Sequence, residues 1–251
     1  MIDLVLGVIS DIHGNIRALD AVISDMERRG IDRVVNLGDC LYGPFDARFV
    51  AERLIDLGWP TVAGNEDRGL VEAQGPEFTA TARFTHEQLF PSHMEWLTAL
   101  PSMLDLGQGI LAVHGTPSSD RDYLLHRPDG TGGMREATEE EIAAALDRTD
   151  AWLTLCGHDH LPRVSRLNDG RTVLNPGSVG CPAYSDDHPV PHAVENGTPH
   201  ARYAIVTLGG GRVDVEPVAI AYDWDAAAAE AESNGFPEWA TWITTGCAVP
   251  A

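Results

Sequence analysis

The stretch LVLGVISDIHGN, residues 4–15, decides the fold because it runs from an apolar segment directly into polar side chains. A short apolar run that ends at turn residues is typical of a buried β-strand, so we predict a strand over residues 4–9. Beyond Asn15, apolar side chains recur at intervals of three and four residues up to Gly30. This spacing predicts an amphipathic helix that ends at the glycine.

The same order of elements repeats downstream. By the same patterns we predict a second strand over residues 33–37 and a second helix over residues 46–57. Residues 61–63 then form a third short apolar segment, again followed by a glycine and a polar residue. Such a β-α-β-α-β series predicts a parallel sheet with right-handed crossovers and therefore an α/β fold.

The rest of the chain is less regular. Helical spacing extends over residues 79–100, with an interruption at Pro91. Residues 116–138 predict an irregular insertion, and the proline-rich residues 182–199 predict a flexible loop. We expect one domain over residues 1–251, with a C-terminal helical tail at 221–251. The other expected elements are strands at 109–113 and 151–156, a helix at 139–146, hairpins around the turns 168–170 and 209–211, and helices at 224–233 and 237–244.

Composition excludes several kinds of chemistry. The 251 residues include 38 Asp and Glu against 17 basic residues, which gives a formal charge of −21. Such a surface repels nucleic acids and anionic membranes, and solubility or adaptation to salt explains it most simply. All 17 basic residues are arginines, so Schiff-base chemistry, a pyridoxal-phosphate lysine and a P-loop lysine are excluded. No apolar run could span a membrane, and four widely spaced cysteines favour the cytoplasm.

Polar residues of the kinds that bind metal ions follow five predicted strands or strand-like segments. Because the carboxyl ends of strands in an open α/β sheet meet at one crevice, we expect these side chains to lie together. Carboxylate, imidazole and carboxamide groups suit manganese, iron or zinc, and they exclude a thiolate site. A carboxylate can bridge two cations. The residues are Asp11 and His13, Asp39, Asn65, His114, and His158 and His160.

In this order the motifs resemble the calcineurin-like metallophosphoesterase superfamily, whose blocks are D-x-H, G-D, G-N-x-(D/E), H and G-H-x-H. Three further segments resemble a bacterial branch of small phosphodiesterases, phosphatases and diadenosine-tetraphosphate hydrolases. They are YGP at 42–44, YL at 123–124 and NPGSVG at 175–180. The resemblance implies a four-layer αββα sandwich, in which two mixed sheets are flanked by helices.

The resemblance also implies two divalent ions, with Mn²⁺ as the first choice and Fe, Zn, Ni or Mg as alternatives. One ion would be bound by Asp11, His13, Asp39 and His160, and the other by Asp39, Asn65, His114 and His158. A hydroxide between the ions would attack phosphorus in line, because a cation lowers the pKa of bound water towards about 7. The catalytic residues expected on this basis are Asp39, Asn65, His114, Glu66 and Asp67.

One position departs from the family pattern. Many relatives have a histidine after the asparagine of the G-N block, where it protonates the leaving group, but this chain has Glu66. A glutamate beside two cations is a poor acid unless burial raises its pKa, so substrates with good leaving groups are favoured. Glu66 could equally be a supporting residue. Asn15, Arg17 and Arg68 are candidates for contacts with the substrate phosphate, and both arginines could instead be solvated surface groups.

The resulting hypothesis is a phosphoesterase acting on small phosphate esters or nucleotides: phosphodiesters, phosphomonoesters or diadenosine polyphosphates. A phosphoprotein phosphatase is the alternative, although no arginine follows Asp39 closely. A noncatalytic scaffold without metals is a second alternative, and a homo-oligomer stays open. The remaining histidines are expected to have packing or surface roles. Those in the proline-rich loop could also form a substrate lid or an adventitious metal site.

Overall fold

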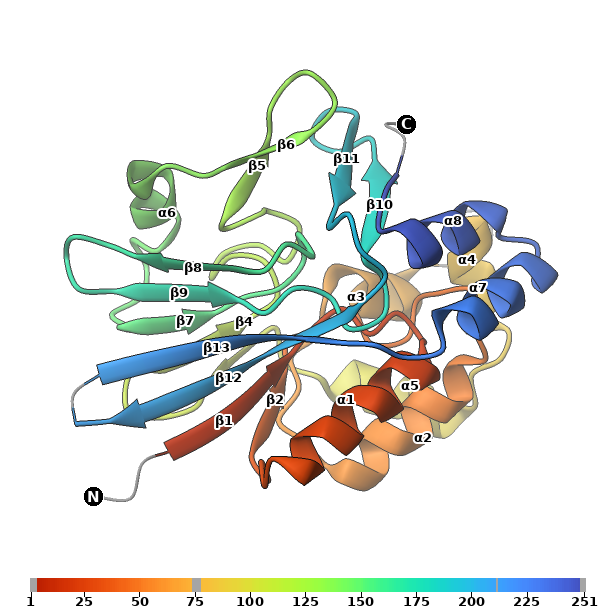
Figure 1. Cartoon of the computed structure of the whole chain (residues 1–251), viewed down its shortest axis with the longest axis horizontal. Coiled ribbons are helices and arrows are strands. Elements are labelled where there is room, and N and C mark those ends of the chain that lie inside the picture. Colours follow the sequence, from red (N-terminus) through yellow and green to blue (C-terminus); the bar gives the residue numbers. More distant parts are fainter. Residues whose placement is uncertain (1–3, 74–77, 211, 249–251) are drawn as a thin grey trace.

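Two mixed β-sheets pack face to face in the computed structural model, which describes residues 4–73, 78–210 and 212–248. Helices and loops cover the outer faces, so the fold is the expected four-layer α/β sandwich (Figure 1). The first sheet has the order β13 (Arg212–Ile220), β12 (Ala201–Gly209), β1 (Leu4–Ile9), β2 (Val34–Asn36). The second has the order β3 (Met103–Asp105), β4 (Ile110–Val113), β7 (Leu153–Leu155), β9 (Thr172–Asn175), β8 (Arg163–Arg166).

Three layers of apolar packing hold the sandwich together. Side chains of β1, β2 and β12 meet those of β4, β7 and β9 between the two sheets. The other face of the first sheet packs against α1 (Ile16–Arg28) and α2 (Ala47–Leu57). The other face of the second sheet packs against α6 (Glu139–Ala145) and the loop before β5. Burial of these continuous apolar faces is the main driving force for the fold.

The predicted helices are confirmed. Pro91 is the first residue of α5 (Pro91–Ala99) and separates it from α4 (Ala80–His86), since proline is favoured at the first helical position. The two expected hairpins are present as β8–β9 and β12–β13, and the tail forms α7 (Trp224–Ser233) and α8 (Pro237–Thr245). Helix α3 (Asn65–Glu72) was not predicted.

The prediction of a parallel sheet was only partly correct. β1 pairs in parallel with β2, but its other neighbour is the antiparallel β12, and residues 61–63 contribute a single bridge from Thr61 to Asn36. Local periodicity could not reveal this, because the pairing of β1 with β12 joins segments about 200 residues apart in sequence.

Two segments expected to be irregular form hairpins. The insertion contains β5 (His126–Pro128) and β6 (Met134–Glu136), and the proline-rich loop contains β10 (Ala183–Asp186) and β11 (His192–Glu195). The prediction of a flexible loop at 182–199 was therefore wrong. The amide of Ala193 donates to Gly132 O and joins the two hairpins, and the side chains of Ala183 and Val194 are buried.

A buried carboxylate fastens α1 to the first sheet. Asp25 accepts hydrogen bonds from Tyr203 Oη on β12 at 2.6 Å, from Arg29 Nε at 2.8 Å and from Arg28 at 2.7 Å. Burial opposes its ionisation, but these donors prevail and lower the pKa of Asp25. The ionised form is therefore the one that the native state stabilises.

We expect Asp25→Asn to reduce the free energy of unfolding at pH 7 by about 1–3 kcal/mol, because charge-assisted hydrogen bonds are lost. The contribution of Asp25 is complete above the unfolded pKa of about 3.9, and it disappears as the pH falls through the lower folded pKa. Urea unfolding of both proteins from pH 7 to pH 3 should show the difference shrinking with acid. A difference that is constant with pH would contradict the assignment. Asp20→Asn is the control, because it removes a partly exposed carboxylate that is paired with Arg53.

Candidate metal centre

The turns after the strands hold the predicted ligands in a strained backbone conformation. Only six non-glycine residues of the described chain have positive φ, and one of them is Gln108. Such a conformation costs about 1–3 kcal/mol per residue and persists where the surroundings enforce it, which is common at functional sites. The other five are predicted ligands: Asp11 (56°), His13 (51°), Asp39 (53°), His158 (71°) and His160 (55°).

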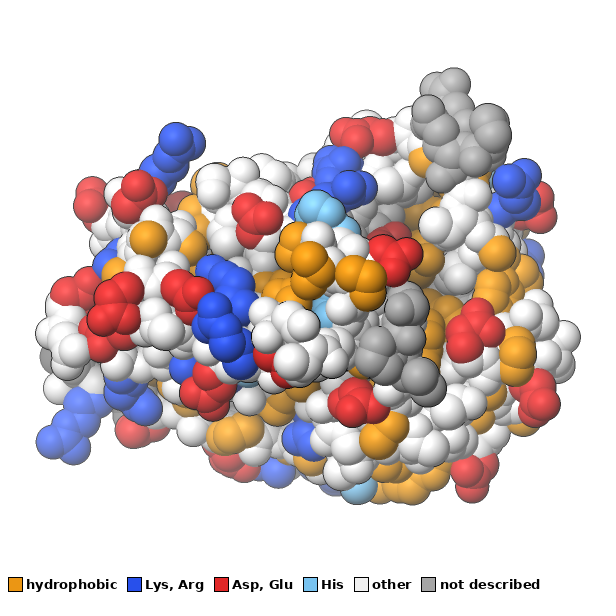
Figure 2. Space-filling view, turned by 90° about the horizontal axis from the view of Figure 1, so that it is seen from above, with side chains coloured by type: hydrophobic (Ala, Val, Ile, Leu, Met, Phe, Trp, Pro, Cys, Tyr) orange, Lys and Arg blue, Asp and Glu red, His pale blue; other side chains and the backbone are white. Residues whose placement is uncertain are grey.

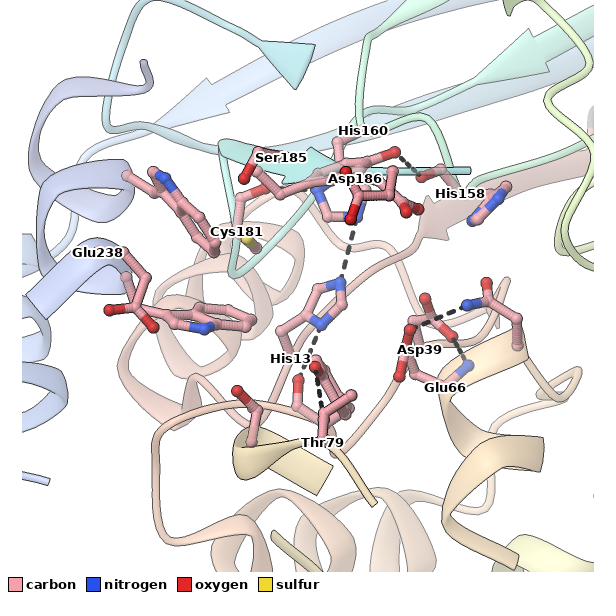
Figure 3. Close-up of a pocket in the computed structure, with 17 residues that line it drawn as sticks. His13, Asp39, Glu66, Thr79, His158, His160, Cys181, Ser185, Asp186 and Glu238 are labelled. Carbon is pink, nitrogen blue, oxygen red and sulfur yellow. Dashed lines mark hydrogen bonds between the residues drawn. The ribbon is translucent and has the colours of Figure 1, made fainter. Parts of the chain in front are cut away.

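The first group of donors consists of Asp11, His13 and His160, all buried. Nε2 of His13 lies 3.1 Å from Nε2 of His160 (Figure 3). The same nitrogen of His160 lies 3.3 Å from Asp11 Oδ1. The Nδ1 atoms of the two histidines contact the carbonyl oxygens of Tyr42 and Cys181. A carbonyl only accepts, so each Nδ1 carries the hydrogen and the Nε2 atoms point lone pairs at each other. A proton or a metal ion must lie between them.

The second group of donors consists of Asp39, His114 and His158, with Asn65 beside them. His114 Nε2 lies 3.3 Å from Asp39 Oδ2 and 3.1 Å from Asn65 Oδ1, while its Nδ1 donates to the carbonyl of Leu37. His158 differs, because its Nε2 donates to the carbonyl of Arg121 and leaves Nδ1 as the free lone pair. Each histidine thus has one ring nitrogen fixed by the backbone and the other available as a ligand.

The spacing of the donors fits metal ions. Adjacent ligands at 2.0–2.1 Å from a common ion are separated by about 3.0–3.4 Å, and the distances of 3.1 and 3.3 Å in both groups lie in that range. The buried Oδ1 of Asp11 has no hydrogen-bond partner among the described residues, as expected for an oxygen that serves as a metal ligand. The mixed nitrogen and oxygen set suits borderline divalent ions.

Electrostatics point the same way. Burial and a neighbouring histidine lower the pKa of His13 and of His158 to about 4, so both are neutral ligands at pH 7. Burial also disfavours the charged form of His114, but Asp39 outweighs it and raises the pKa of His114 to about 10. Asp11 raises the pKa of His160 in the same way. Each group therefore favours a positive charge, which a metal ion supplies.

Glu66 and Asp67 occupy different positions on α3. Glu66 lines the cleft, donates its amide to Asp39 Oδ1 at 2.9 Å, and accepts from Asn65 Nδ2 at 3.0 Å. Burial, followed by the nearby carboxylates of Asp39, Asp186 and Asp67, raises the pKa of Glu66 to about 8. Two cations would act in the opposite direction. Asp67 is turned away and accepts from the amides of Cys40 and Gly64, so it joins the two ligand-bearing loops.

The three predicted phosphate contacts are not among the residues that line the cleft. Asn15 is buried as the N-cap of α1, where it accepts from the amide of Ala18. Arg17 is paired with Glu230, and Arg68 is bound to Asp120 and Glu72. All three side chains therefore have partners within the protein.

The cleft beside the metal centre has a volume of about 390 Å³. Tyr42, Thr79 and Thr81 line part of it. Two further walls come from elements that the sequence did not associate with the site. The β10 strand and the turn after it contribute Tyr184, Asp186 and Asp187, and α8 contributes Glu238, Trp239 and Trp242 (Figure 3). The Trp239 ring lies 5.7 Å from that of His13. The suggestion of a substrate lid was the only sequence signal for either wall.

Other histidines are used in packing, as expected. His126 contacts Asp159 through Nδ1 at 2.9 Å, and His192 contacts the Tyr123 hydroxyl through Nε2 at 2.8 Å. Both are buried. Asp159 also accepts from Asn175 at 2.7 Å, so these contacts hold the turn that carries His158 and His160.

Comparison with known proteins agrees with the fold and the donor groups. A family model described as the calcineurin-like phosphoesterase superfamily domain matches residues 4–196. The uncharacterized protein MJ0912 of Methanocaldococcus jannaschii is 24% identical over 261 residues, which covers 95% of this chain and 96% of that protein. The crystal structure of a metallophosphoesterase from Sphaerobacter thermophilus has 26% identity and a TM-score of 0.76, and the match covers 97% of this chain and 99% of that one.

The fold and the paired donor groups define a metallophosphoesterase, a hydrolase that acts on phosphate ester bonds. The chain belongs to the calcineurin-like phosphoesterase superfamily. Among its described residues, no helix is both long and apolar enough to cross a bilayer.

Proposed function

We propose that the protein hydrolyses small phosphate esters or nucleotides with two divalent ions, Mn²⁺ first among them. Asp11, His13 and His160 would hold one ion, Asn65, His114 and His158 the other, and Asp39 would bridge them. When bound, such ions lower the pKa of water and neutralise charge on the phosphoryl group. The observation that carries this proposal is the pair of donor groups at ligand spacing in one cleft.

The chain's own residues would prepare the site for this chemistry. Backbone carbonyls fix the histidine tautomers, so the ligand nitrogens face the cleft before substrate arrives. The amide of Glu66 fixes Asp39 Oδ1 at 2.9 Å. Trp239 and Tyr184 border the site and would exclude water from one side of the substrate.

The C-terminal tail is part of this proposal. The family match ends at residue 196, yet Glu238 and Trp239 line the cleft. We therefore assign α8 to the substrate site. Four free cysteines, three of them buried, support a reducing compartment such as the cytoplasm.

Metal content and turnover test the proposal together. The purified protein should contain close to two equivalents of metal, and it should hydrolyse bis-p-nitrophenyl phosphate or p-nitrophenyl phosphate with Mn²⁺. Chelation should abolish turnover, and Mn²⁺ should restore it. No metal and no turnover would instead support the noncatalytic alternative. A preference for phosphopeptides over small esters would support the phosphoprotein phosphatase.

Glu66→His should favour substrates with poor leaving groups, because an imidazolium can donate a proton that a carboxylate cannot. We expect the ratio of kcat/KM for β-glycerol phosphate to that for p-nitrophenyl phosphate to rise about tenfold or more. Glu66→Gln, which removes the charge without adding an acid, is the matched control and should show no such rise. Equal changes for both substrates in Glu66→His would count against this role.

A further inference from the structure

A second pocket, with a volume of about 380 Å³, lies among the loop 116–123, β5 and the end of the β10–β11 hairpin. Much of its polar lining consists of hydrogen-bond donors that suit an anion. They are the guanidinium groups of Arg121 and Arg127, the imidazole of His188, and the hydroxyls of Thr116 and Ser118.

This second pocket adjoins the metal centre through two contacts. The Tyr123 ring, part of the pocket lining, stacks on the His158 ring with 4.6 Å between centroids. The carbonyl of Arg121 accepts the hydrogen bond from His158 Nε2 at 3.0 Å. One residue thus lines the pocket and orients a ligand of the proposed second ion.

Neither arginine of the second pocket has a carboxylate partner within the described ranges. Arg127 donates to the carbonyls of Tyr123 and His126, and the exposed Arg121 guanidinium has no hydrogen bond or ion pair there. Arg68, Arg163 and Arg171 are paired with acids, whereas Arg33, Arg148 and Arg166 also lack a carboxylate partner within the described ranges. What distinguishes the second pocket is that two such arginines line it together, in a chain with 38 acidic and 17 basic residues. Asp122 is the acidic residue that shares the lining.

The main cleft has the opposite character. Its lining includes the carboxylates of Glu66, Asp186, Asp187 and Glu238, and no arginine is among the described residues that line it. A phosphate beyond the one at the metal centre would find no cationic side chain there. On the face that carries the ends of both hairpins, basic and acidic side chains are interspersed (Figure 2). An anion can therefore approach this face in spite of the net charge.

We propose that the second pocket is an anion subsite, which binds a phosphate group other than the one being hydrolysed. This proposal rests on the proposed phosphoesterase function. Arginine suits the role because its planar fork donates two parallel hydrogen bonds to phosphate oxygens and always stays charged. The hydroxyls of Thr116 and Ser118 would add donors at the same pocket.

Two chromogenic esters with the same leaving group test the subsite. They are thymidine 5′-(p-nitrophenyl phosphate) and the same ester carrying a 3′-phosphate. The Mn²⁺-loaded wild-type protein should prefer the 3′-phosphorylated ester by about tenfold in kcat/KM, since hydrogen bonds to a charged group carry that much discrimination. Arg121→Gln should reduce the preference to about twofold or less. Arg121→Lys should keep part of it through the remaining charge.

Arg33→Gln is the matched control, because Arg33 is exposed, lies outside the second pocket and loses the same charge. Its preference should equal that of the wild type. An equal loss in both glutamine variants would show a general charge effect and overturn the proposal. Unchanged melting temperatures would confirm that all variants fold.

Calorimetry with inorganic phosphate distinguishes a substrate phosphate from free phosphate. The metal-loaded wild type should bind phosphate at two sites and Arg121→Gln at one. Two-site binding without a preference for the 3′-phosphorylated ester would identify free phosphate as the ligand. One site in the wild type and equal turnover of both esters would overturn the subsite, while the phosphoesterase function would stand. No turnover of either ester would instead tell against the phosphoesterase function.

Discussion

Asp39→Asn is expected to reduce kcat/KM for bis-p-nitrophenyl phosphate by about a thousandfold. Its carboxylate lies 3.3 Å from His114 Nε2 and influences the pKa of His13 in the other donor group. Asparagine keeps one oxygen but loses the charge and the second ligand atom. Loss of bridging would remove several kcal/mol of charge stabilisation, and each 1.36 kcal/mol is a factor of ten in rate.

The Asp39→Asn experiment needs metal analysis beside kinetics. The variant should bind less than two equivalents of metal. Asp20→Asn, at a partly exposed carboxylate that is paired with Arg53, should retain both metals and full activity. Activity above one tenth of the wild-type value, with two metals still bound, would rule out a bridging role. Circular dichroism would confirm that the variant is folded.

Gly180→Ala is expected to reduce the free energy of unfolding by about 3 kcal/mol or more. A Cβ at this position would overlap the carbonyl oxygen of Ile12 and lie 2.7 Å from its carbonyl carbon and 2.8 Å from Asn15 Cβ. The loop around Gly180 is hydrogen-bonded to the first ligand-bearing turn, since its amide donates to Asp11 O at 3.0 Å. The overlap involves backbone, which cannot move aside as a side chain can.

The same substitution should weaken metal binding, because displacement of Ile12 moves the neighbours Asp11 and His13. Thermal unfolding with and without Mn²⁺ would measure both effects. Gly69→Ala is the control: no atom of the described residues lies within 4 Å of its added Cβ, and alanine in helix α3 should stabilise by up to about 1 kcal/mol. A melting temperature of Gly180→Ala within a degree of the wild-type value would disprove the close approach.

Local sequence patterns predicted much of the fold and the residues of the two donor groups. Apolar spacing placed α1 and α2, and the strand-end rule led to Asp11, Asp39, His114 and His158. Asn65 is an instructive exception, because it begins helix α3 rather than ending a strand. Its side chain reaches His114 all the same.

What the sequence could not show depends on contacts between distant segments. Trp239 meets His13 from the far end of the chain, and nothing in the tail's own pattern marks it as part of a cleft. Asp186 faces the site only because residues 183–195 form a hairpin. The sequence did not predict this hairpin, because the four prolines of residues 182–199 favour an irregular loop. Glu230, which pairs with Arg17, and Asp120, one of the two partners of Arg68, are likewise acids from other elements.

The position of α8 has an evolutionary consequence. The proposed metal-binding residues all lie within the matched family segment, whereas one wall of the cleft lies beyond it. Substitutions in α8 can therefore alter one wall of the cleft while every proposed metal ligand stays in place. Two homologues with identical motifs can differ in substrate preference. The substrate preference of one cannot be transferred to the other unless their final fifty residues also correspond.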